Sequence, residues 1–272
     1  MQFRKANGAL GAFVVDVQIS RLTAVQLEKI RLAFDQYSVL VFRDQNLTPA
    51  QQISFTESFG EVRQHPLYRS AVLDQYPEIL VLEHKTGEWI NGRNDTWHAD
   101  VTFEKKPPLG SVLYCLDIQE GFGDTLFCNM RRAYQDLSHE LQSMVKKMTA
   151  EHSAVRMIER NNRYRYNVPI ESVPDSVIHP VVRTDLSNSP SLFVNPIYTV
   201  GISGMTVSES EPLLEFLYTQ ATRHENIYRH RWIKGDVLIF DNRCTMHYAV
   251  IDYGPEMHRL MHRTTAAGSV PT

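Results

Sequence analysis

The chain has 272 residues, of which 43% are hydrophobic and 22% charged, and its formal net charge is −3. These values are typical of a globular protein, and at this length roughly three quarters of the unfolded surface is buried on folding. We therefore expect a single domain over residues 1–272. The slightly acidic balance gives no support for binding to nucleic acid or to an anionic membrane. An anionic ligand has to be held by individually placed arginines rather than by a general positive field.

The three cysteines, Cys115, Cys128 and Cys244, are odd in number and widely spaced. This spacing favours free thiols in a reducing compartment over a disulfide framework. The glycines in the short apolar patch near the N-terminus argue against a signal peptide, and no run approaches the roughly 18 apolar residues of a membrane span. We therefore expect a cytoplasmic protein.

Three segments carry helix signals. Thr23 with Gln26 is typical of a capping box, and Thr48, followed by a proline at the first helical position, is typical of another N-cap. The predicted helices cover residues 23–37, 48–60 and 208–223. Short β-rich runs lie between them, at residues 38–42, 79–82, 111–116, 177–182, 192–194 and 236–240. Because these runs do not alternate regularly with helices, the pattern favours an antiparallel, mainly β fold with flanking helices over a doubly wound parallel sheet.

The segment from Trp97 to Asp100 places the His98 imidazole and the Asp100 carboxylate two residues apart. On extended backbone, positions i and i+2 point to the same side, so both side chains can reach one ion. A third ligand has to come from elsewhere, and His247 in the segment TMHYAV is the candidate. Two histidines and one carboxylate form the facial triad of non-haem Fe(II) oxygenases, which leaves positions open for a cosubstrate and O₂. The His-x-Asp motif alone is a weak signal, and a surface carboxylate beside a core histidine is the alternative.

Two arginines, Arg259 and Arg263, follow His247 by 12 and 16 residues. Four residues apart on a strand, they share a face. The far carboxylate of 2-oxoglutarate favours a bidentate guanidinium partner, and Arg259 is placed for that role, with the Thr125 hydroxyl as a second donor. Arg263 could then hold the anion of a substrate. A surface salt bridge is the alternative for either arginine, but it explains the pair less well.

Motifs spread in order over most of the chain are VFRDQNLTPAQQ, FGEV with HPLY, WHADVTFEKKPPLGSVL, GFGDTLF, AEH, HPVVRT, LFVN, and DNRCTMHYAVIDY through MHRTT. Together they resemble the taurine dioxygenase/2,4-D dioxygenase family of Fe(II)/2-oxoglutarate enzymes, most of all its taurine dioxygenase members. The resemblance implies a double-stranded β-helix (jelly roll), iron ligands at His98, Asp100 and His247, and 2-oxoglutarate contacts from Thr125 and Arg259. It implies hydroxylation of a substrate C–H by O₂, with release of succinate and CO₂. We also expect a homo-oligomer, either a dimer or a tetramer.

The resemblance also implies which residues receive the substrate. Pocket positions of the family read here as His65, Tyr68, Asn94 and Arg263, and the backbone N–H of Val101 matches one that contacts a sulfonate. Such groups form an anion site, so we expect a small anionic substrate: a sulfonate such as taurine, an alkyl sulfate, or an aryloxy or alkyl carboxylate. Protonation of His65 would strengthen this contact, so the substrate affinity is expected to weaken as the pH rises past about 6.5.

The chain departs from the family in and near the pocket. Two pocket phenylalanines of the family read as Ile158 and Tyr198, and a tryptophan near the iron reads as Phe240. One extra residue between His247 and Arg259 leaves open whether the two arginine roles are exchanged. Two alternative functions stay open: the same chemistry in a biosynthetic role on an amino acid or a pathway intermediate, and a metal-binding jelly roll without turnover.

Two further segments near the expected site are distinctive. Residues 161–166 interleave basic and aromatic side chains and are expected to form a loop or lid over the metal rather than a nucleic-acid strip. The segment 241–243 is expected either to orient the loop that carries His247 or to be a plain turn. The other histidines are expected to be structural or at the surface: His84, His139, His152, His179, His224, His230, His258 and His262.

Overall fold

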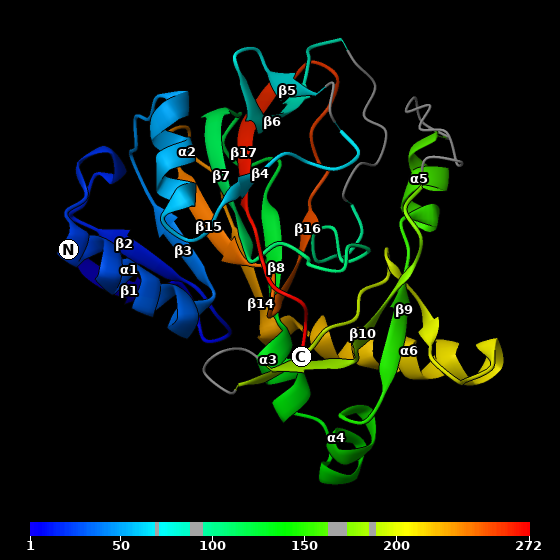
Figure 1. Cartoon of the computed structure of the whole chain (residues 1–272). Helices are drawn as coiled ribbons and strands as arrows, with labels where there is room; N and C mark the ends of the chain where they lie inside the picture. The colour runs from blue at the N-terminus through cyan, green and yellow to red at the C-terminus, as the bar shows by residue number, and fades with distance from the viewer. Residues whose placement is uncertain (69–70, 88–94, 163–172, 185–188) are drawn as a thin grey trace.

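The computed structural model describes residues 1–68, 71–87, 95–162, 173–184 and 189–272, and its centre is a pair of facing β-sheets (Figure 1). The larger sheet has the strand order β1 (Gln2–Lys5), β2 (Ala12–Val15), β3 (Val39–Phe42), β15 (Val237–Asp241), β7 (Gly110–Asp117), β17 (Arg259–Ala266), β6 (Tyr76–His84) and β5 (Val72–Leu73), and β4 (Val62–Arg63) also pairs with β17. The second sheet has the order β14 (Ile227–His230), β8 (Thr125–Asn129) and β16 (Thr245–Ala249). Two facing, mostly antiparallel sheets confirm the predicted mainly β, jelly-roll architecture.

Helices and smaller sheets surround this pair. The helices are α1 (Ala24–Tyr37), α2 (Pro49–Glu57), α3 (Met130–Gln135), α4 (His139–Val145), α5 (Val155–Asn162) and α6 (Val207–Ala221), with 3-10 turns η1 (Ile19–Arg21) and η3 (His224–Asn226). One small sheet has the order β10 (Val177–Pro180), β9 (Thr149–His152) and β13 (Thr199–Ile202), and the other joins β11 (Val182–Thr184) to β12 (Pro190–Leu192). No helix in the described parts of the chain has the length and apolar character that crossing a membrane requires.

Strand alternation divides the interior into layers. In β3, Leu40 and Phe42 pack with α1 and α2, whereas Val39 and Val41 belong to the layer between the two sheets. This is the period of two that extended backbone imposes. The layer between the sheets also holds Phe127 of β8, whose ring lies 6.1 Å from that of His247. The outer face of the second sheet packs against α3 and α6. The metal-ligand candidates therefore lie at the inter-sheet layer.

The predicted capping box at the start of α1 and the predicted N-cap at Thr48 of α2 are confirmed, and Thr48 also forms a capping box with Gln51. Helix α1 ends at Tyr37 as predicted, because Ser38 adopts a left-handed conformation with φ 63°. Helix α2 ends at Glu57, before the predicted stop at Gly60. Helix α6 begins at Val207 rather than at residue 208, because Thr206 is its N-cap.

The expectation of about three helices was too low. Helices α3, α4 and α5 span 6, 7 and 8 residues, too short for an apolar period to be visible. Helix α3 follows β8 directly, with Asn129 as both the last strand residue and the N-cap. The strand predicted at 177–182 is divided into β10 and β11, with Val181 between them.

All three cysteines are free and buried, in agreement with the predicted absence of a disulfide framework. Burial raises the pKa of Cys115 and of Cys128 to about 12. These thiols are therefore protonated at neutral pH and act as small apolar side chains.

A buried histidine in β9 is expected to make the folding stability depend on pH. Burial and the neighbouring His179 lower the pKa of His152 to about 3, and the His152 ring lies 5.9 Å from that of Phe193. Because an unfolded histidine titrates near 6.5, only the unfolded chain takes up this proton between pH 6.5 and 3. The free energy of unfolding should therefore fall with pH below about 6.5, by about 1.4 kcal/mol per pH unit from His152 alone.

Urea unfolding at pH 7.5 and 5.5 would measure this effect. The His152→Gln variant should lose less stability between the two pH values than the wild type. His139→Gln, which alters an exposed histidine, is the matched control and should behave like the wild type. An unchanged pH dependence in His152→Gln would show that His152 is not the source.

Candidate active site

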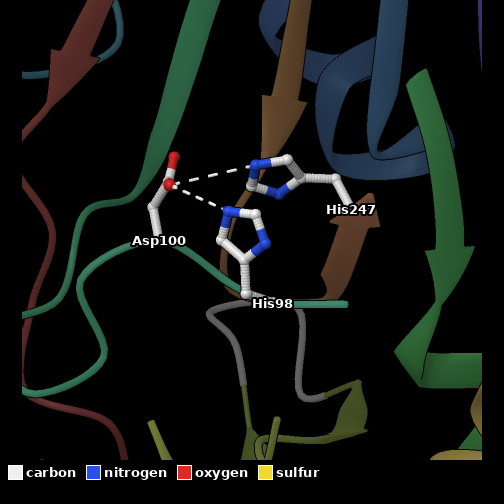
Figure 2. Close-up of side chains that lie close together, drawn as sticks. All are labelled: His98, Asp100 and His247. Carbon is white, nitrogen blue, oxygen red and sulfur yellow. Dashed lines mark ion pairs between the residues drawn. The ribbon is translucent and has the colours of Figure 1, made fainter. Parts of the chain in front are cut away.

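Three potential metal ligands converge at the edge of the second sheet (Figure 2). His98 forms an isolated antiparallel bridge with His247 of β16, in which each backbone N–H donates to the partner's carbonyl, at 3.0 and 2.7 Å. The Asp100 Oδ1 atom lies 3.8 Å from the Nε2 atom of each histidine. The three ligand atoms lie within 4.8 Å of one another, so one ion can contact all of them.

The backbone at Asp100 differs from the expected extended segment. His98 is extended, but Asp100 begins a turn, and the next residue, Val101, has a left-handed φ of 54°. For a β-branched residue this conformation is strained, and such strain is concentrated at functional sites. The turn, rather than strand alternation, therefore brings the carboxylate to the two imidazoles.

Two buried polar side chains hold Asp100 in place. The Asn242 Oδ1 atom accepts the Asp100 N–H at 2.6 Å, and Asn242 Nδ2 donates to the Asp100 carbonyl at 2.9 Å. The Ser111 hydroxyl donates to Asp100 Oδ2 at 3.2 Å. The segment 241–243 thus supports Asp100 through Asn242, and the Asp241 carbonyl also accepts the Thr245 hydroxyl at 2.7 Å, two residues before His247. In the sequence, Ser111 stands out only as a hydroxyl residue near the start of a mainly apolar strand.

The protonation state of the cluster suits a metal ion. Burial alone would raise the pKa of Asp100, but the Arg263 guanidinium and the two imidazoles hold it below its usual range. Burial lowers the pKa of His98, and lowers that of His247 to about 3. The His98 Nδ1 atom lies 2.7 Å from the Thr96 carbonyl oxygen, so in the neutral ring Nδ1 donates and the Nε2 lone pair is left for a metal. One carboxylate and two neutral imidazoles fit a divalent transition metal.

The two arginines of β17 share a face, as predicted. Met261 between them belongs to the layer between the sheets, and alternation places Arg259 and Arg263 on the same side. Arg263 Nη1 donates to Asp100 Oδ1 at 3.1 Å. Arg259 Nη2 lies 3.5 Å from the carbonyl of Gly123. Among the described residues, the Nε atoms of both arginines are buried and have no hydrogen-bond partner.

Gly123 is required for the close approach of Arg259. Its φ is +64°, and a Cβ atom added there would lie 3.0 Å from Arg259 Nε. Thr125, which follows after one residue, is buried at the start of β8. Arg259 therefore lies at the Thr125 end of the inter-sheet layer, and Arg263 lies at the end that holds the three potential ligands.

Most of the predicted substrate residues lie together. Val101, Ile158 and Tyr198 belong to one apolar cluster, against which Tyr68 packs. The His65 ring is stacked on that of Tyr68 at 4.5 Å. Burial raises the pKa of Tyr198, and the nearby Val101 backbone N–H opposes this rise. Asn94 lies outside the described residues, as does most of the predicted loop or lid at residues 161–166.

The predicted protonation of His65 was wrong. Burial and the adjacent Arg263 lower the pKa of His65 to about 3. Its Nδ1 atom accepts the backbone N–H groups of Leu67 and Tyr68, both at 3.2 Å, so the neutral ring carries its hydrogen on Nε2. Because the ring is already neutral at pH 6, it loses no proton near pH 6.5.

Two further contacts near the potential metal ligands involve Phe240 and helix α5. Phe240 lies beside His247, with ring centroids 4.6 Å apart. Arg160 of α5 forms an ion pair with Asp95 and a hydrogen bond with Thr96. Helix α5 is thereby joined to the segment that precedes His98.

Comparison with known proteins identifies the family of the chain. Residues 2–265 match the family model for taurine catabolism dioxygenase, TauD/TfdA family. The chain is 33% identical to an alkylsulfatase of Acinetobacter baylyi, over 100% of this chain and 86% of that protein. It is 32% identical to an alpha-ketoglutarate-dependent 2,4-dichlorophenoxyacetate dioxygenase of Cupriavidus pinatubonensis, over 87% of each. The crystal structure of a taurine dioxygenase from Burkholderia xenovorans matches with a TM-score of 0.84 and 32% identity, over 100% of this chain and 90% of that one. The chain therefore belongs to the TauD/TfdA family of dioxygenases.

Proposed function

We propose that residues 1–272 form a single Fe(II)- and 2-oxoglutarate-dependent dioxygenase domain that hydroxylates a C–H of a small anionic substrate. The observation that carries the proposal is the buried His98, Asp100 and His247 cluster, with two inward-facing arginines on the opposite sheet. Relatives named for sulfate esters, sulfonates and 2,4-dichlorophenoxyacetate support a sulfonate, alkyl sulfate or aryloxy or alkyl carboxylate as substrate. Bound iron, with 2-oxoglutarate and O₂, would supply the oxidation of the C–H and release succinate and CO₂.

The metal would be held by Nε2 of His98, Nε2 of His247 and a carboxylate oxygen of Asp100. The paired hydrogen bonds from Asn242 fix the backbone of Asp100, and the Ser111 hydroxyl fixes its second oxygen. One carboxylate does not neutralise a dication. The centre therefore keeps a positive charge that favours an anionic cosubstrate.

The far carboxylate of 2-oxoglutarate would be bound by Arg259 and the Thr125 hydroxyl. The buried Nε of Arg259, which has no partner among the described residues, supports this role, because a buried N–H donor is costly unless a ligand accepts its hydrogen. Arg259 lies next to Gly123, two residues before Thr125. This location supports Arg259 as the residue that binds the cosubstrate and Arg263 as the residue that binds the substrate.

The anionic group of the substrate would be bound by Arg263, with the Nε2–H of His65 and the backbone N–H of Val101 as further donors. Arg263 has five N–H donors in a planar fork, so its contact to Asp100 leaves others for a ligand. We include Asn94 in this site from the family resemblance. The apolar wall formed by Tyr68, Ile158 and Tyr198 would receive the rest of the substrate and exclude water.

We also propose that the protein acts in the cytoplasm and assembles into a homo-oligomer. Buried free thiols support a reducing compartment, the cytoplasm. Val25 and Leu32 are 68% and 64% exposed, and one face of α1 carries both. These two exposed apolar side chains support assembly into a dimer or a tetramer.

A substrate panel tests the proposed function. With Fe(II), 2-oxoglutarate and O₂, succinate formation should increase on adding taurine, an alkyl sulfate or 2,4-dichlorophenoxyacetate. Neutral analogues, in which an alcohol or an amide replaces the anion, should give a roughly 10- to 100-fold lower kcat/KM. Since His65 is neutral, its titration should cause no fall in substrate affinity between pH 6 and 8.

Each outcome of the panel distinguishes one hypothesis. Equal turnover of the neutral analogues would contradict the anion site. If an added amino acid were turned over and none of these anions were, the biosynthetic alternative would be supported. If the metal-loaded protein formed no succinate in the presence of any of these compounds, a non-catalytic metal-binding protein would be favoured.

A further inference from the structure

The hydroxyl of Thr125 is held by a buried tryptophan. Thr125 lies at the start of β8, the central strand of the second sheet, where its Cα partners are His230 of β14 and Ala249 of β16. Its Oγ1 atom accepts a hydrogen bond of 2.9 Å from the indole Nε1–H of Trp232. Thr125 is 4% exposed and Trp232 is 1% exposed. Bulk water therefore does not compete with this contact.

The direction of this hydrogen bond determines what Thr125 can offer a ligand. An indole N–H can only donate, so the contact occupies a lone pair of Thr125 Oγ1. The hydrogen of the hydroxyl is then left to be donated to another acceptor. Because Thr125 is two residues from Phe127, which belongs to the layer between the sheets, alternation directs its side chain into that layer, on the side of Arg259.

We propose that Trp232 is a positioning residue for the cosubstrate: it orients the Thr125 hydroxyl so that its hydrogen is donated to the far carboxylate of 2-oxoglutarate. This inference rests on the proposed function. Without the indole N–H, the hydroxyl can rotate freely, and its rotation has to be fixed when it donates to the carboxylate. This ordering costs free energy on binding, so part of the affinity for 2-oxoglutarate depends on Trp232.

A buried polar chain fixes the indole in turn. The His230 ring packs edge-on against the Trp232 ring, with centroids 4.3 Å apart and an interplanar angle of 89°. His230 Nε2 lies 3.1 Å from Asp236 Oδ2, and His230 Nδ1 lies 3.0 Å from the Tyr228 hydroxyl. Burial lowers the pKa of His230. In the neutral ring Nε2 donates to Asp236, because a carboxylate only accepts, and Nδ1 is left to accept from Tyr228. Asp236 is in turn paired with Arg43. Both nitrogens of His230 are thus engaged, and the surface against which Trp232 packs is fixed.

Equilibrium binding tests the inference without turnover. The full chain, loaded with Mn(II) in place of iron, is titrated calorimetrically with 2-oxoglutarate. Trp232→Phe should weaken binding by roughly 3- to 10-fold, the range expected for one hydrogen bond. In a Thr125→Val background the same substitution should cause no further loss, because the hydroxyl that it orients is absent. Tyr114→Phe, which removes another buried aromatic donor, to the Gln45 carbonyl at 3.3 Å, is the matched control and should bind like the wild type.

A second variant separates the hydrogen bond from the packing. Incorporation of 3-benzothienylalanine at position 232 keeps the bicyclic shape and removes only the N–H, so it should weaken binding as much as Trp232→Phe. Wild-type affinity in the benzothienyl protein, or additive losses in the double variant, would overturn the inference and assign Trp232 to packing alone. If the wild-type Mn(II) protein did not bind 2-oxoglutarate at all, the proposed function itself would fail.

Discussion

Replacement of His98, Asp100 or His247 by alanine is expected to abolish metal binding and 2-oxoglutarate turnover. The three ligand atoms lie within 4.8 Å of one another, and each substitution leaves only two to hold a labile divalent ion. Asp100→Ala also leaves the buried Arg263 without the carboxylate that it contacts. We expect metal affinity to fall by more than about 100-fold, the upper end of the loss caused by removing a supporting contact. Calorimetric metal titration and succinate formation would measure the two effects.

Matched variants show whether the loss is specific to the ligands. His262→Ala removes a histidine of β17 that is not in the cluster, and it should keep metal binding close to that of the wild type. Ser111→Ala removes a hydrogen bond to Asp100 but no ligand, so its loss should be intermediate. Near-normal turnover of any one of the three ligand variants would mean that the residue is not a ligand.

The sequence was most informative where local rules determine the structure. The capping box at Thr23 and the N-cap at Thr48 predicted helix starts, because the contacts that make a cap lie within four residues. The alternation in β17 placed Arg259 and Arg263 on one face, since the side-chain period of a strand is fixed by the backbone. The histidine and aspartate of the potential metal site could be identified because their spacing is short.

The supporting contacts depend on tertiary packing and had no comparable signal. Asn242 holds Asp100 across 142 positions of sequence, and Trp232 donates to Thr125 across 107. Neither pairing follows a local rule. The low pKa of His65 likewise depends on burial and on Arg263, which lies far away in the sequence. The turn at Asp100 was missed because Val101 adopts a left-handed conformation that β-branched residues rarely take.

Replacement of Arg259 by alanine is expected to raise the 2-oxoglutarate requirement far more than the substrate requirement. Its guanidinium lies beside Gly123, and its Nε is buried without a partner among the described residues. A carboxylate bound there and then left unpaired loses about 2–4 kcal/mol, or roughly 30- to 1000-fold in affinity. The KM for 2-oxoglutarate, measured at saturating metal and substrate, would show this loss.

Arg263 provides the comparison that decides which arginine binds the cosubstrate. Because Arg263 Nη1 contacts Asp100 Oδ1 at 3.1 Å, its substitution by alanine also removes a counter-charge from a potential metal ligand. The comparison therefore uses Arg263→Lys, which keeps the charge but loses the planar fork. We expect Arg263→Lys to raise the KM for the anionic substrate and to leave the KM for 2-oxoglutarate nearly unchanged, the reverse of Arg259→Ala. If Arg263→Lys instead raised mainly the 2-oxoglutarate KM, and Arg259→Ala mainly the substrate KM, the extra residue after His247 would have exchanged the two roles.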